Sequence, residues 1–469
     1  MKKNLLDIFF NSKSIFKKHP ALGPVSDDRT LLRNTLSIAW PSVVEAFLIA
    51  VVGFVDTMMV SSLGDAAIAA VGLTSQPKML SLAAFFALTP AVAALVARRK
   101  GENDRASAVR VVKLALIVTA VLCVVITVVF LIFSQDIIRI AGAESDTQTF
   151  AVEYFQIIVL GMVFNVFTMT INAAQRGAGN TKISMYTSVT SNLINIVFNY
   201  LLIGGNFGFP RLGVRGAAIA TVIGTVVALV MAVASVLHPD GFVYLRLHTG
   251  GVYESRSARS MLSLYSSTFV EQLFLRVGFF VYAMIIAGLG TTSFTTHQIA
   301  MNVLTISFAF GDGLSASSVA LVGRSLGERR PDLSRIYCSF CQRCGLICSI
   351  SLSVIYVFFG RFIFALFSKT PQVLHDGEII MKLMCLIVLI QIAQVIYSGC
   401  LRGSGDAKFT ALVSFINISV LRPVLAYIAC YTLGLGVLGA WTALLVDQTI
   451  RLLMTSARFK SGKWSGIEL

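Results

Sequence analysis

The chain has 469 residues, of which 56% are hydrophobic and 13% charged, and its mean hydropathy is +0.80. A soluble protein of this size has too little interior to bury that much apolar surface, so the composition excludes a water-soluble globular protein. The net charge of +15 comes from basic residues spread over many loops, which argues against nucleic acid as a partner and predicts contact with a lipid bilayer.

Twelve apolar segments are long enough to cross a bilayer as helices, because about 20 residues span its hydrocarbon core. We predict an all-α integral membrane protein, since backbone groups that face lipid must bond within their own segment. The predicted spans are 36–61, 71–96, 112–133, 150–174, 183–203, 214–237, 261–289, 297–322, 338–359, 378–400, 409–431 and 436–456.

Lysine and arginine are distributed by loop: alternate predicted loops are rich in them, whereas loops 61–75 and 290–296 contain none. Because basic loops stay on the cytoplasmic side, this pattern predicts a multi-pass protein of the plasma (inner) membrane with both termini in the cytoplasm. The predicted parts are a cytoplasmic N-terminal segment 1–33, an N-lobe 34–237, a cytoplasmic linker 238–260, a C-lobe 261–456 and a cytoplasmic tail 457–469.

The two halves of the chain repeat each other. Residues 44–101 return in register as residues 270–327, which start 226 positions later. The matched positions include Glu45 with Glu271, Arg98 with Arg324 and Arg176 with Arg402. In a polytopic membrane protein, such duplication is typical of transporters and predicts two six-helix lobes.

Polar groups inside the membrane are costly and are therefore candidates for function. Asp56 lies five residues before the predicted outer end of the first span, and Glu45 shares its helix face. Asn195 and Asn199 lie on one face of span 183–203, with Asn199 at the depth of Asp56. Because hard cations prefer oxygen ligands, these groups predict a seat for H⁺ or Na⁺, although asparagines also serve simply to join helices.

The second lobe offers a further set of intramembrane polar residues. Glu271 repeats Glu45 near mid-membrane and is predicted to face a cavity of the C-lobe, together with three residues of span 378–400, namely Gln391, Gln394 and Tyr397. Secondary candidates are Glu45, Gln298 and Asp312. A separate pair, Arg422 and Asp447, lies at similar depth, so that a purely structural ion pair is an alternative to function there.

Motifs for catalysis are missing from the sequence. It has no His-Glu-x-x-His segment and no phosphate-binding glycine loop, so we predict that the protein is not an enzyme and uses no cofactor. Four cysteines have iron–sulfur spacing, but one predicted helix spreads them over about 15 Å, too far for one cluster. They are Cys338, Cys341, Cys344 and Cys348, and we predict no metal site. Transport would then depend on a gradient of H⁺ or Na⁺.

Several short motifs occur together in a fixed order. Pro41 and Glu45 precede an Asp56-Thr57 pair in the first span, and Arg176 and Arg402 each open an Arg-Gly-x-Gly turn. The His297-Gln298 pair and the Val322-Gly-Arg-x-x-Gly327 loop complete the pattern. In these motifs nearly the whole chain, 33–456, resembles the multidrug and toxic compound extrusion (MATE) transporters, with a leaning toward the DinF-like branch from the turn that ends at Asp406.

The resemblance implies a V-shaped pair of six-helix lobes that works as a monomer by alternating access. Such transporters export cationic or amphipathic small molecules in exchange for H⁺ or Na⁺. An alternative with the same lobes is a flippase or exporter of a lipid-linked or polyanionic metabolite. That activity needs several cationic side chains in the cavity, and we find only Arg276 and Arg422.

Matching positions carry over the family's site residues. By this resemblance Asp56 corresponds to the acidic residue of the N-lobe cation site, and Asn195 to an asparagine of that site. Asn199 stands where some members have a second aspartate. Glu271 corresponds to the glutamate used in C-lobe models of Na⁺ coupling in NorM-like members, but Gln391 replaces their aspartate, which favours coupling through Asp56.

Overall fold

The structure, a computed structural model, describes residues 9–12, 20–61, 65–141, 145–246 and 255–467. These residues form helices and connecting turns, with no strand among them. They form two compact units, which we call the N-unit (Val44–Leu262) and the C-unit (Met1–Val43 with Ser263–Leu469). Parts of the predicted cytoplasmic segments 1–33, 238–260 and 457–469 lie outside the described residues.

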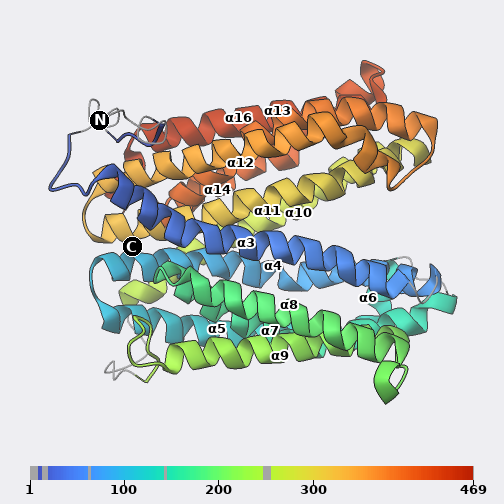
Figure 1. Ribbon diagram of the computed structural model, residues 1–469, viewed down its shortest axis with the longest axis horizontal. Coiled ribbons are helices and arrows are strands. Elements are labelled where there is room, and N and C mark those ends of the chain that lie inside the picture. Colours follow the sequence, from blue (N-terminus) through green and yellow to red (C-terminus); the bar gives the residue numbers. More distant parts are fainter. Residues whose placement is uncertain (1–8, 13–19, 62–64, 142–144, 247–254, 468–469) are drawn as a thin grey trace. The chain divides into compact units, whose positions relative to one another are not determined.

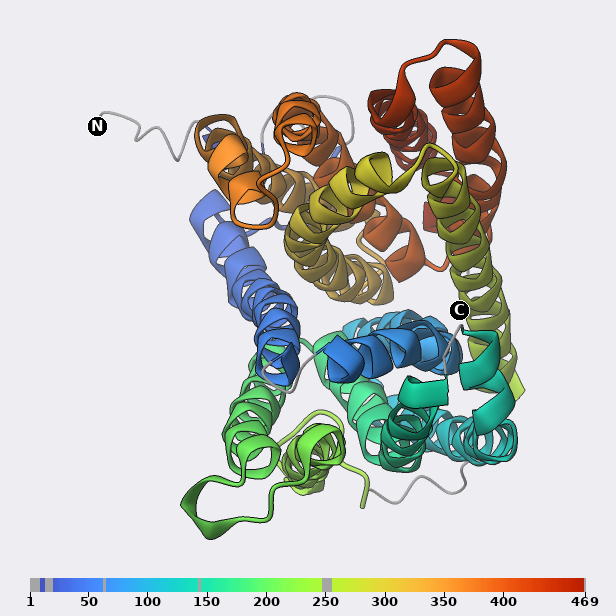
Figure 2. The ribbon, with the colours of Figure 1, turned by 90° about the vertical axis from the view of Figure 1, so that its right-hand side faces the viewer.

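The N-unit begins within α3 (Asp28–Ser61), so the first part of that helix belongs to the C-unit. Its long helices run alongside one another, as the side view of Figure 1 and the end view of Figure 2 show. α4 packs on α7, and α9 packs on both α7 and α8. The other N-unit elements are α4 (Asp65–Gly101), α5 (Arg105–Ile132), α6 (Ser134–Ile140), α7 (Ser145–Gly177), α8 (Thr181–Gly204), η1 (Asn206–Gly208) and α9 (Gly213–Leu237).

The C-unit is built around α13, which packs against α11, α12 and α16. One predicted span, 409–431, divides into four helical stretches, two of them π-helical. A π turn widens the helix locally and often marks a functional position. The C-unit elements are α10 (Ser255–Ala287, whose residues up to Leu262 belong to the N-unit), α11 (Thr291–Gly327), α12 (Pro331–Ala365), α13 (Pro371–Ser404), α14 (Ala407–Ser414), η2 (Phe415–Leu421), α15 (Arg422–Tyr427), η3 (Ile428–Thr432), α16 (Gly436–Lys460) and η4 (Lys463–Gly466).

All twelve predicted spans are helical in the structure, which confirms the all-α fold. Eleven segments of the described residues are long and apolar enough to cross a membrane. The remaining predicted span, 183–203, is α8, whose asparagines, serines and threonines lower its hydropathy below that of the others. The polar content that makes α8 the weakest span also supplies the side chains of the candidate site.

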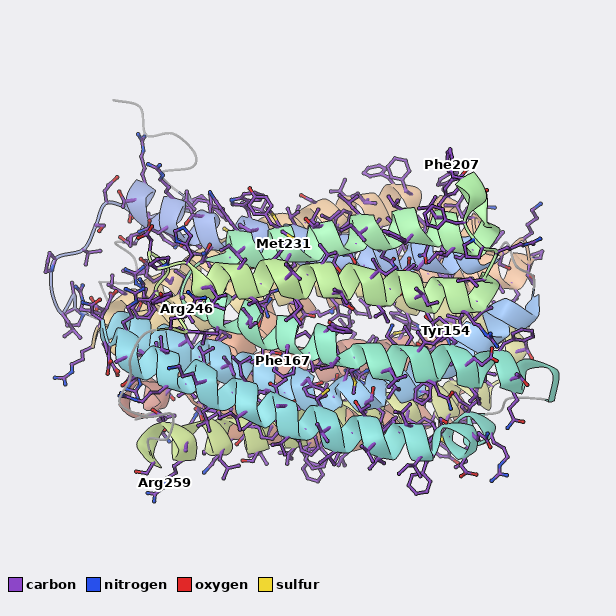
Figure 3. All side chains as sticks on the ribbon, turned by 90° about the horizontal axis from the view of Figure 1, so that it is seen from below. Tyr154, Phe167, Phe207, Met231, Arg246 and Arg259 are labelled. Carbon is purple, nitrogen blue, oxygen red and sulfur yellow. The ribbon has the colours of Figure 1, made fainter. Side chains whose placement is uncertain are left out.

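The outer surfaces of the helices are apolar. Val124 and Val128 of α5 and Phe358 and Phe362 of α12 are exposed, as side chains that face lipid should be. Many charged side chains, by contrast, lie near the ends of the helices. In the N-unit, Figure 3 shows Arg246 and Arg259 at one end and Phe207 and Tyr154 at the other. Which side of the membrane the basic end faces stays a prediction.

Candidate functional site

Asp56 lies in the last two turns of α3, where it meets two asparagines of α8. Asn199 Nδ2 donates a hydrogen bond of 2.7 Å to Asp56 Oδ1. Asn195 lies one turn earlier on the same face of α8, which the four-residue spacing dictates. Both asparagines are buried, and Asp56 is half-buried. The structure thus brings together the three residues for which the sequence predicted cation coupling.

The Asn195 amide satisfies its neighbours when its nitrogen faces the carboxylate. In that orientation Nδ2 donates to Asp56 Oδ1 at 2.7 Å and to Oδ2 at 3.2 Å, while Oδ1 lies 3.1 Å from Thr221 Oγ1 of α9. The opposite orientation suits a protonated or cation-bound Asp56, because Asn195 Oδ1 would then face the proton or cation. The amide can therefore serve both states of the carboxylate.

An unused acceptor completes the oxygen cluster. Asn199 Oδ1 is buried, and no hydrogen-bond donor among the described residues is bonded to it. An orphaned buried carbonyl oxygen is costly unless it gains a partner. Beside a carboxylate, the partners that fit such an oxygen are a proton donor, a water molecule or a hard cation such as Na⁺. The donor set therefore fits a small cation.

A glycine allows α9 to approach α8 beside this cluster. A Cβ at Gly224 would lie 2.6 Å from the Ser191 backbone oxygen, so no other residue fits without moving the helices apart. Thr221 lies one turn before Gly224 and reaches Asn195 because of this close approach. Sequence reasoning missed Thr221. Its signal was the pairing of a small residue and a hydroxyl one turn apart in an apolar span.

Sequence reasoning also missed Lys78, a cation inside the second span. It belongs to α4, directly after Pro77, and its charge interacts with that of Asp56. No ion pair of 4 Å or less and no side-chain hydrogen bond holds its ammonium among the residues that the structure describes. A lone lysine in an apolar helix is itself a sequence signal, because intramembrane cations are rare and are retained for function.

Glu45, by contrast, is neutralised within the N-unit. Its carboxylate lies 3.4 Å from Arg176 Nη1 and accepts hydrogen bonds of 2.9 Å from the hydroxyls of Ser184 and Ser188. Arg176 Nη1 in turn donates to Ser184 Oγ at 2.7 Å. Glu45 is 7% exposed, so this buried charge is both paired and hydrogen-bonded, as burial of a charge requires.

The C-unit contains the same arrangement. Arg402 Nη2 lies 2.7 Å from Glu271 Oε1, and Arg402 Nε lies 3.3 Å from Oε2. Thr410 and Ser414 donate to the same carboxylate at 3.1 and 3.3 Å. Glu271, which was predicted to face a cavity, is thus 2% exposed and held by an arginine.

All four members of this arrangement repeat in the two halves at the spacing of 226 positions. The pairs are Glu45 with Glu271, Arg176 with Arg402, Ser184 with Thr410 and Ser188 with Ser414. We call each set of four a Glu–Arg clamp. The sequence showed the repeated acids and arginines but not that they pair, because repeat spacing does not reveal which helices touch.

The N-unit charges at Asp56 and Lys78 do not repeat. At the spacing of 226 positions their counterparts are Tyr282 and Leu304. Tyr282 is buried and donates its hydroxyl to the Ala440 carbonyl oxygen at 2.8 Å. The C-terminal half therefore lacks the counterparts of both Asp56 and Lys78, whereas the N-terminal half has both charges.

Arg422 and Asp447 form a fully buried ion pair in the C-unit. Arg422 Nε donates to Asp447 Oδ2 at 3.0 Å, and both side chains have 0% exposure. The guanidinium also lies 5.0 Å from the Phe279 ring centroid. The structural alternative considered for this pair therefore has direct support, because each charge has its partner.

The remaining sequence candidates lie at separate places in the C-unit. Gln391 and Gln394 of α13 are buried, and Gln394 Nε2 donates to Ser398 on its own helix at 2.8 Å. Tyr397 is half-buried against Phe459, with ring centroids 5.8 Å apart. On α11, two further candidates are exposed, namely Gln298 and Asp312.

Comparison with known proteins identifies the family. The MatE family model matches residues 41–201 and 268–428, two segments that correspond to the two repeats. The chain belongs to the MatE (MATE) family. This MATE protein is therefore a membrane transporter and not an enzyme, which confirms both predictions. Its assignment to the DinF-like branch stays a prediction.

Relatives and solved structures align over nearly their whole lengths. "Uncharacterized transporter YisQ" of Bacillus subtilis strain 168 is 24% identical, with 96% of this chain and 98% of the relative covered. "Probable multidrug resistance protein NorM" of Thermotoga maritima is 26% identical, with 96% of each covered.

The solved structures show the same fold at low identity. The outward-facing conformation of a multidrug resistance MATE family transporter has a TM-score of 0.84 at 20% identity and covers 94% of this chain and 99% of its own. A Pyrococcus furiosus transporter of the MOP superfamily, described as having a binding pocket of reverse polarity, has a TM-score of 0.85 at 21% identity. It covers 94% of this chain and 98% of its own.

Proposed function

We propose that this MATE protein is a secondary active antiporter that exports cationic or amphipathic small molecules in exchange for H⁺ or Na⁺ by alternating access. The export of drug-like compounds is supported by relatives such as the probable multidrug resistance protein NorM of Thermotoga maritima. Asp56 is the carboxylate that binds the coupling ion. Asn195, Asn199 and Thr221 position it and complete the oxygen cluster.

One observation carries this assignment. Six acids in the predicted spans are buried or half-buried in the structure. Five of them have a basic partner: Glu45, Glu153, Glu271 and Asp447 are paired with arginine and Glu378 with lysine. Among the described residues, Asp56 is held only by neutral amides within hydrogen-bonding distance. A carboxylate locked to arginine keeps its charge throughout a cycle, whereas one held by amides can exchange a proton or Na⁺.

The carboxylate and the two amides have different roles in coupling. The amides of Asn195 and Asn199 orient the carboxylate without neutralising it, so ion binding changes the charge of the site by one. A ligand that binds one conformation better than the other shifts the equilibrium toward it. Access of Asp56 to one aqueous side at a time would then link ion entry to substrate exit.

Transport in proteoliposomes tests the proposal. Wild-type protein should accumulate rhodamine B or its ethyl ester when a pH gradient without Na⁺, or a Na⁺ gradient at constant pH, is imposed. Asp56→Asn should lose this gradient-driven uptake while still binding dye without a gradient. The matched control is Asp136→Asn, an exposed acid paired with Arg139. Undiminished coupling in Asp56→Asn would overturn the assignment, and the two gradients distinguish H⁺ from Na⁺.

The alternative activity on polyanionic metabolites has less support. Of the two arginines that the sequence offered for a diphosphate, Arg422 is neutralised by Asp447. That leaves Arg276 as the arginine of that pair still open to such a ligand. Uptake of a fluorescent polyanion that exceeds uptake of both rhodamines would favour this alternative.

A further inference from the structure

The connection between α8 and α9, residues 205–212, carries exposed aromatic side chains, and we call it the aromatic loop. Phe207 is 86% exposed, and Phe209 and the neighbouring Tyr200 of α8 are exposed as well. The ring centroids of Tyr200 and Phe207 are 6.4 Å apart. In Figure 3 Phe207 lies at the end of the N-unit that is opposite to Arg246. Clustered exposed apolar side chains mark a surface that interacts with a partner.

The fold does not require so long a connection. Eight residues, 205–212, join α8 to α9, whereas three residues, 433–435, join η3 to α16 in the C-unit. The Leu212-Gly-Val motif returns at Leu435, a spacing of 223 positions instead of 226. The N-terminal half therefore has additional residues before this motif, and the long loop is a feature of that half alone.

Phe207 also has an unfavourable backbone conformation. Its φ of 55° and ψ of 30° lie in the left-handed region, which bulky L-residues rarely adopt. Among the described residues, the other non-glycine residues with positive φ are Asn103 and Arg329, which occupy equivalent turns of the two repeats. Phe207 has no such counterpart, because Leu433, 226 positions later, has a φ of −86°. Strain of this kind is concentrated at functional sites, and its effect here is to expose an aromatic ring.

Hydrogen bonds fix the aromatic loop on the end of α8. Asn206 Nδ2 donates to the Tyr200 carbonyl oxygen at 2.7 Å, and the Leu212 backbone N–H donates to the Leu202 carbonyl oxygen at 2.9 Å. In Figures 1 and 2 the loop, drawn in green, projects sideways from the ends of α8 and α9 and away from the other helices of the N-unit. The loop therefore presents its aromatic side chains in a defined direction, beside the helices.

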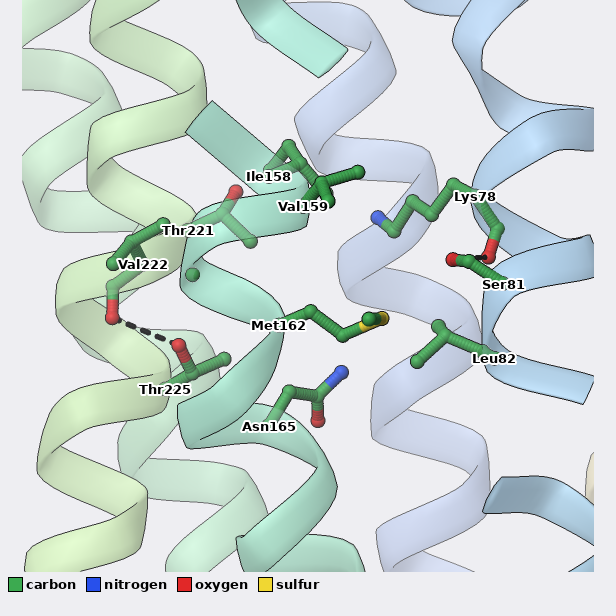
Figure 4. A pocket seen from close by; sticks show the side chains of 11 residues that line it. Lys78, Ser81, Leu82, Ile158, Val159, Met162, Asn165, Thr221, Val222 and Thr225 are labelled. Atoms are coloured by element: carbon green, nitrogen blue, oxygen red, sulfur yellow. Dashed lines mark hydrogen bonds between the residues drawn. The ribbon is translucent and has the colours of Figure 1, made fainter. Parts of the chain in front are cut away.

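The two faces of α8 show what surrounds the loop. On one face Asn195 contacts Thr221, which lines a small cavity between α4, α7 and α9 (Figure 4). The opposite face carries the exposed side chains of Leu193, Val197 and Tyr200, whose helical spacing forms one apolar stripe. On a membrane span such a stripe faces lipid. The aromatic loop continues this stripe at the end of the span.

We propose that the aromatic loop is a membrane anchor, in which Phe207 and Phe209 insert at the boundary between the headgroups and the acyl chains of phospholipids. A loop that projects sideways from the end of a span lies at the level of the headgroups, where aromatic side chains are enriched. Arg211 is exposed in the same loop, and its guanidinium can donate to a lipid phosphate. The anchor holds that end of α8 at the membrane surface.

Tryptophan quenching in nanodiscs tests the anchor. Phe207→Trp keeps an aromatic ring in the loop. Asn103→Trp is the matched control, because Asn103 is also exposed, lies between two N-unit helices and has a φ of 57°. After subtraction of the wild-type signal, lipids brominated on the acyl chain near the headgroup should quench the fluorescence of Phe207→Trp strongly, and aqueous iodide should quench it weakly. Asn103→Trp should show the reverse.

A second comparison tests whether Phe207 itself causes the anchoring. Phe209→Trp serves as the reporter, and adding Phe207→Asn removes the ring while supplying a residue that tolerates positive φ. The double variant should lose most of the lipid quenching that Phe209→Trp shows alone. Size-exclusion chromatography verifies that all variants are folded.

Two results would overturn the inference. One is iodide quenching of Phe207→Trp as strong as that of Asn103→Trp, which would assign the loop to water and to a soluble partner. The other is unchanged lipid quenching in the double variant. Neither measurement uses a substrate or an ion gradient, so the outcome is independent of the transport test.

Discussion

The C-unit Glu–Arg clamp offers the sharpest test of the structure. Replacing Glu271 by Gln keeps the volume of the side chain and one oxygen acceptor, so Thr410 and Ser414 retain a partner. The substitution removes the negative charge that Arg402 contacts at 2.7 and 3.3 Å. Breaking a buried pair from one side costs about 3–5 kcal/mol. Because the Arg402 side chain is 22% exposed and keeps some water, we expect the lower end, about 3 kcal/mol.

The tryptophans provide a local assay. All three of them, Trp40, Trp441 and Trp464, belong to the C-unit, so intrinsic fluorescence during an SDS titration reports on the unfolding of that unit. Glu271→Gln should shift this transition strongly. Glu45→Gln breaks the equivalent clamp of the N-unit and should shift it much less. If Glu271→Gln leaves the transition unchanged but abolishes ion-driven transport, Glu271 is a coupling carboxylate and the clamp reasoning is wrong.

Two further predictions concern other charges. Asp447→Asn should destabilise the C-unit by about 3 kcal/mol because it strands Arg422, and adding Arg422→Met should recover much of the loss in the same titration. Asp104 caps α5 by accepting from the Ser107 backbone at 2.9 Å, so Asp104→Ala should cost about 1 kcal/mol by N-unit thermal unfolding.

Asp104 also predicts a dependence on pH. Burial would raise its pKa, but the hydrogen bonds from Ser107 and the charges of Arg110 and Arg99 together lower it below the usual value of 3.8. A lowered pKa means that the cap stabilises fully above that value and is lost as the pH falls through the lowered pKa. Melting curves of wild type and Asp104→Ala should therefore converge in strong acid, and a constant difference down to low pH would contradict this account.

The sequence predicted the helices well because a membrane span needs about 20 apolar residues wherever it occurs. It also placed Asp56, Asn195 and Asn199 on faces that could meet, since helical spacing fixes which residues share a face. It did not place Thr221, because spacing within one helix says nothing about the neighbour across the interface. Only the packing of α9 on α8 at Gly224 reveals that contact.

The electrostatic partners were harder to predict. Glu271 was interpreted as a cavity residue because an intramembrane acid is a functional candidate by default. The partner that neutralises it, Arg402, lies 131 positions away in a turn that was interpreted only as a motif. Lys78 escaped notice because one charge barely changes the hydropathy of a long apolar segment. In each case the decisive information was a distance between helices.

The duplicated clamp gives this protein an internal reference. Because the same four-residue arrangement occurs in both halves, a property that both share belongs to the common ancestor of the halves and to their architecture. The opposite charges of Asp56 and Lys78 occur in one half only, so they distinguish that half from the shared architecture. One polypeptide therefore contains both the architecture that the two halves inherited and a pair of charges by which the halves differ, either gained by one half or lost from the other.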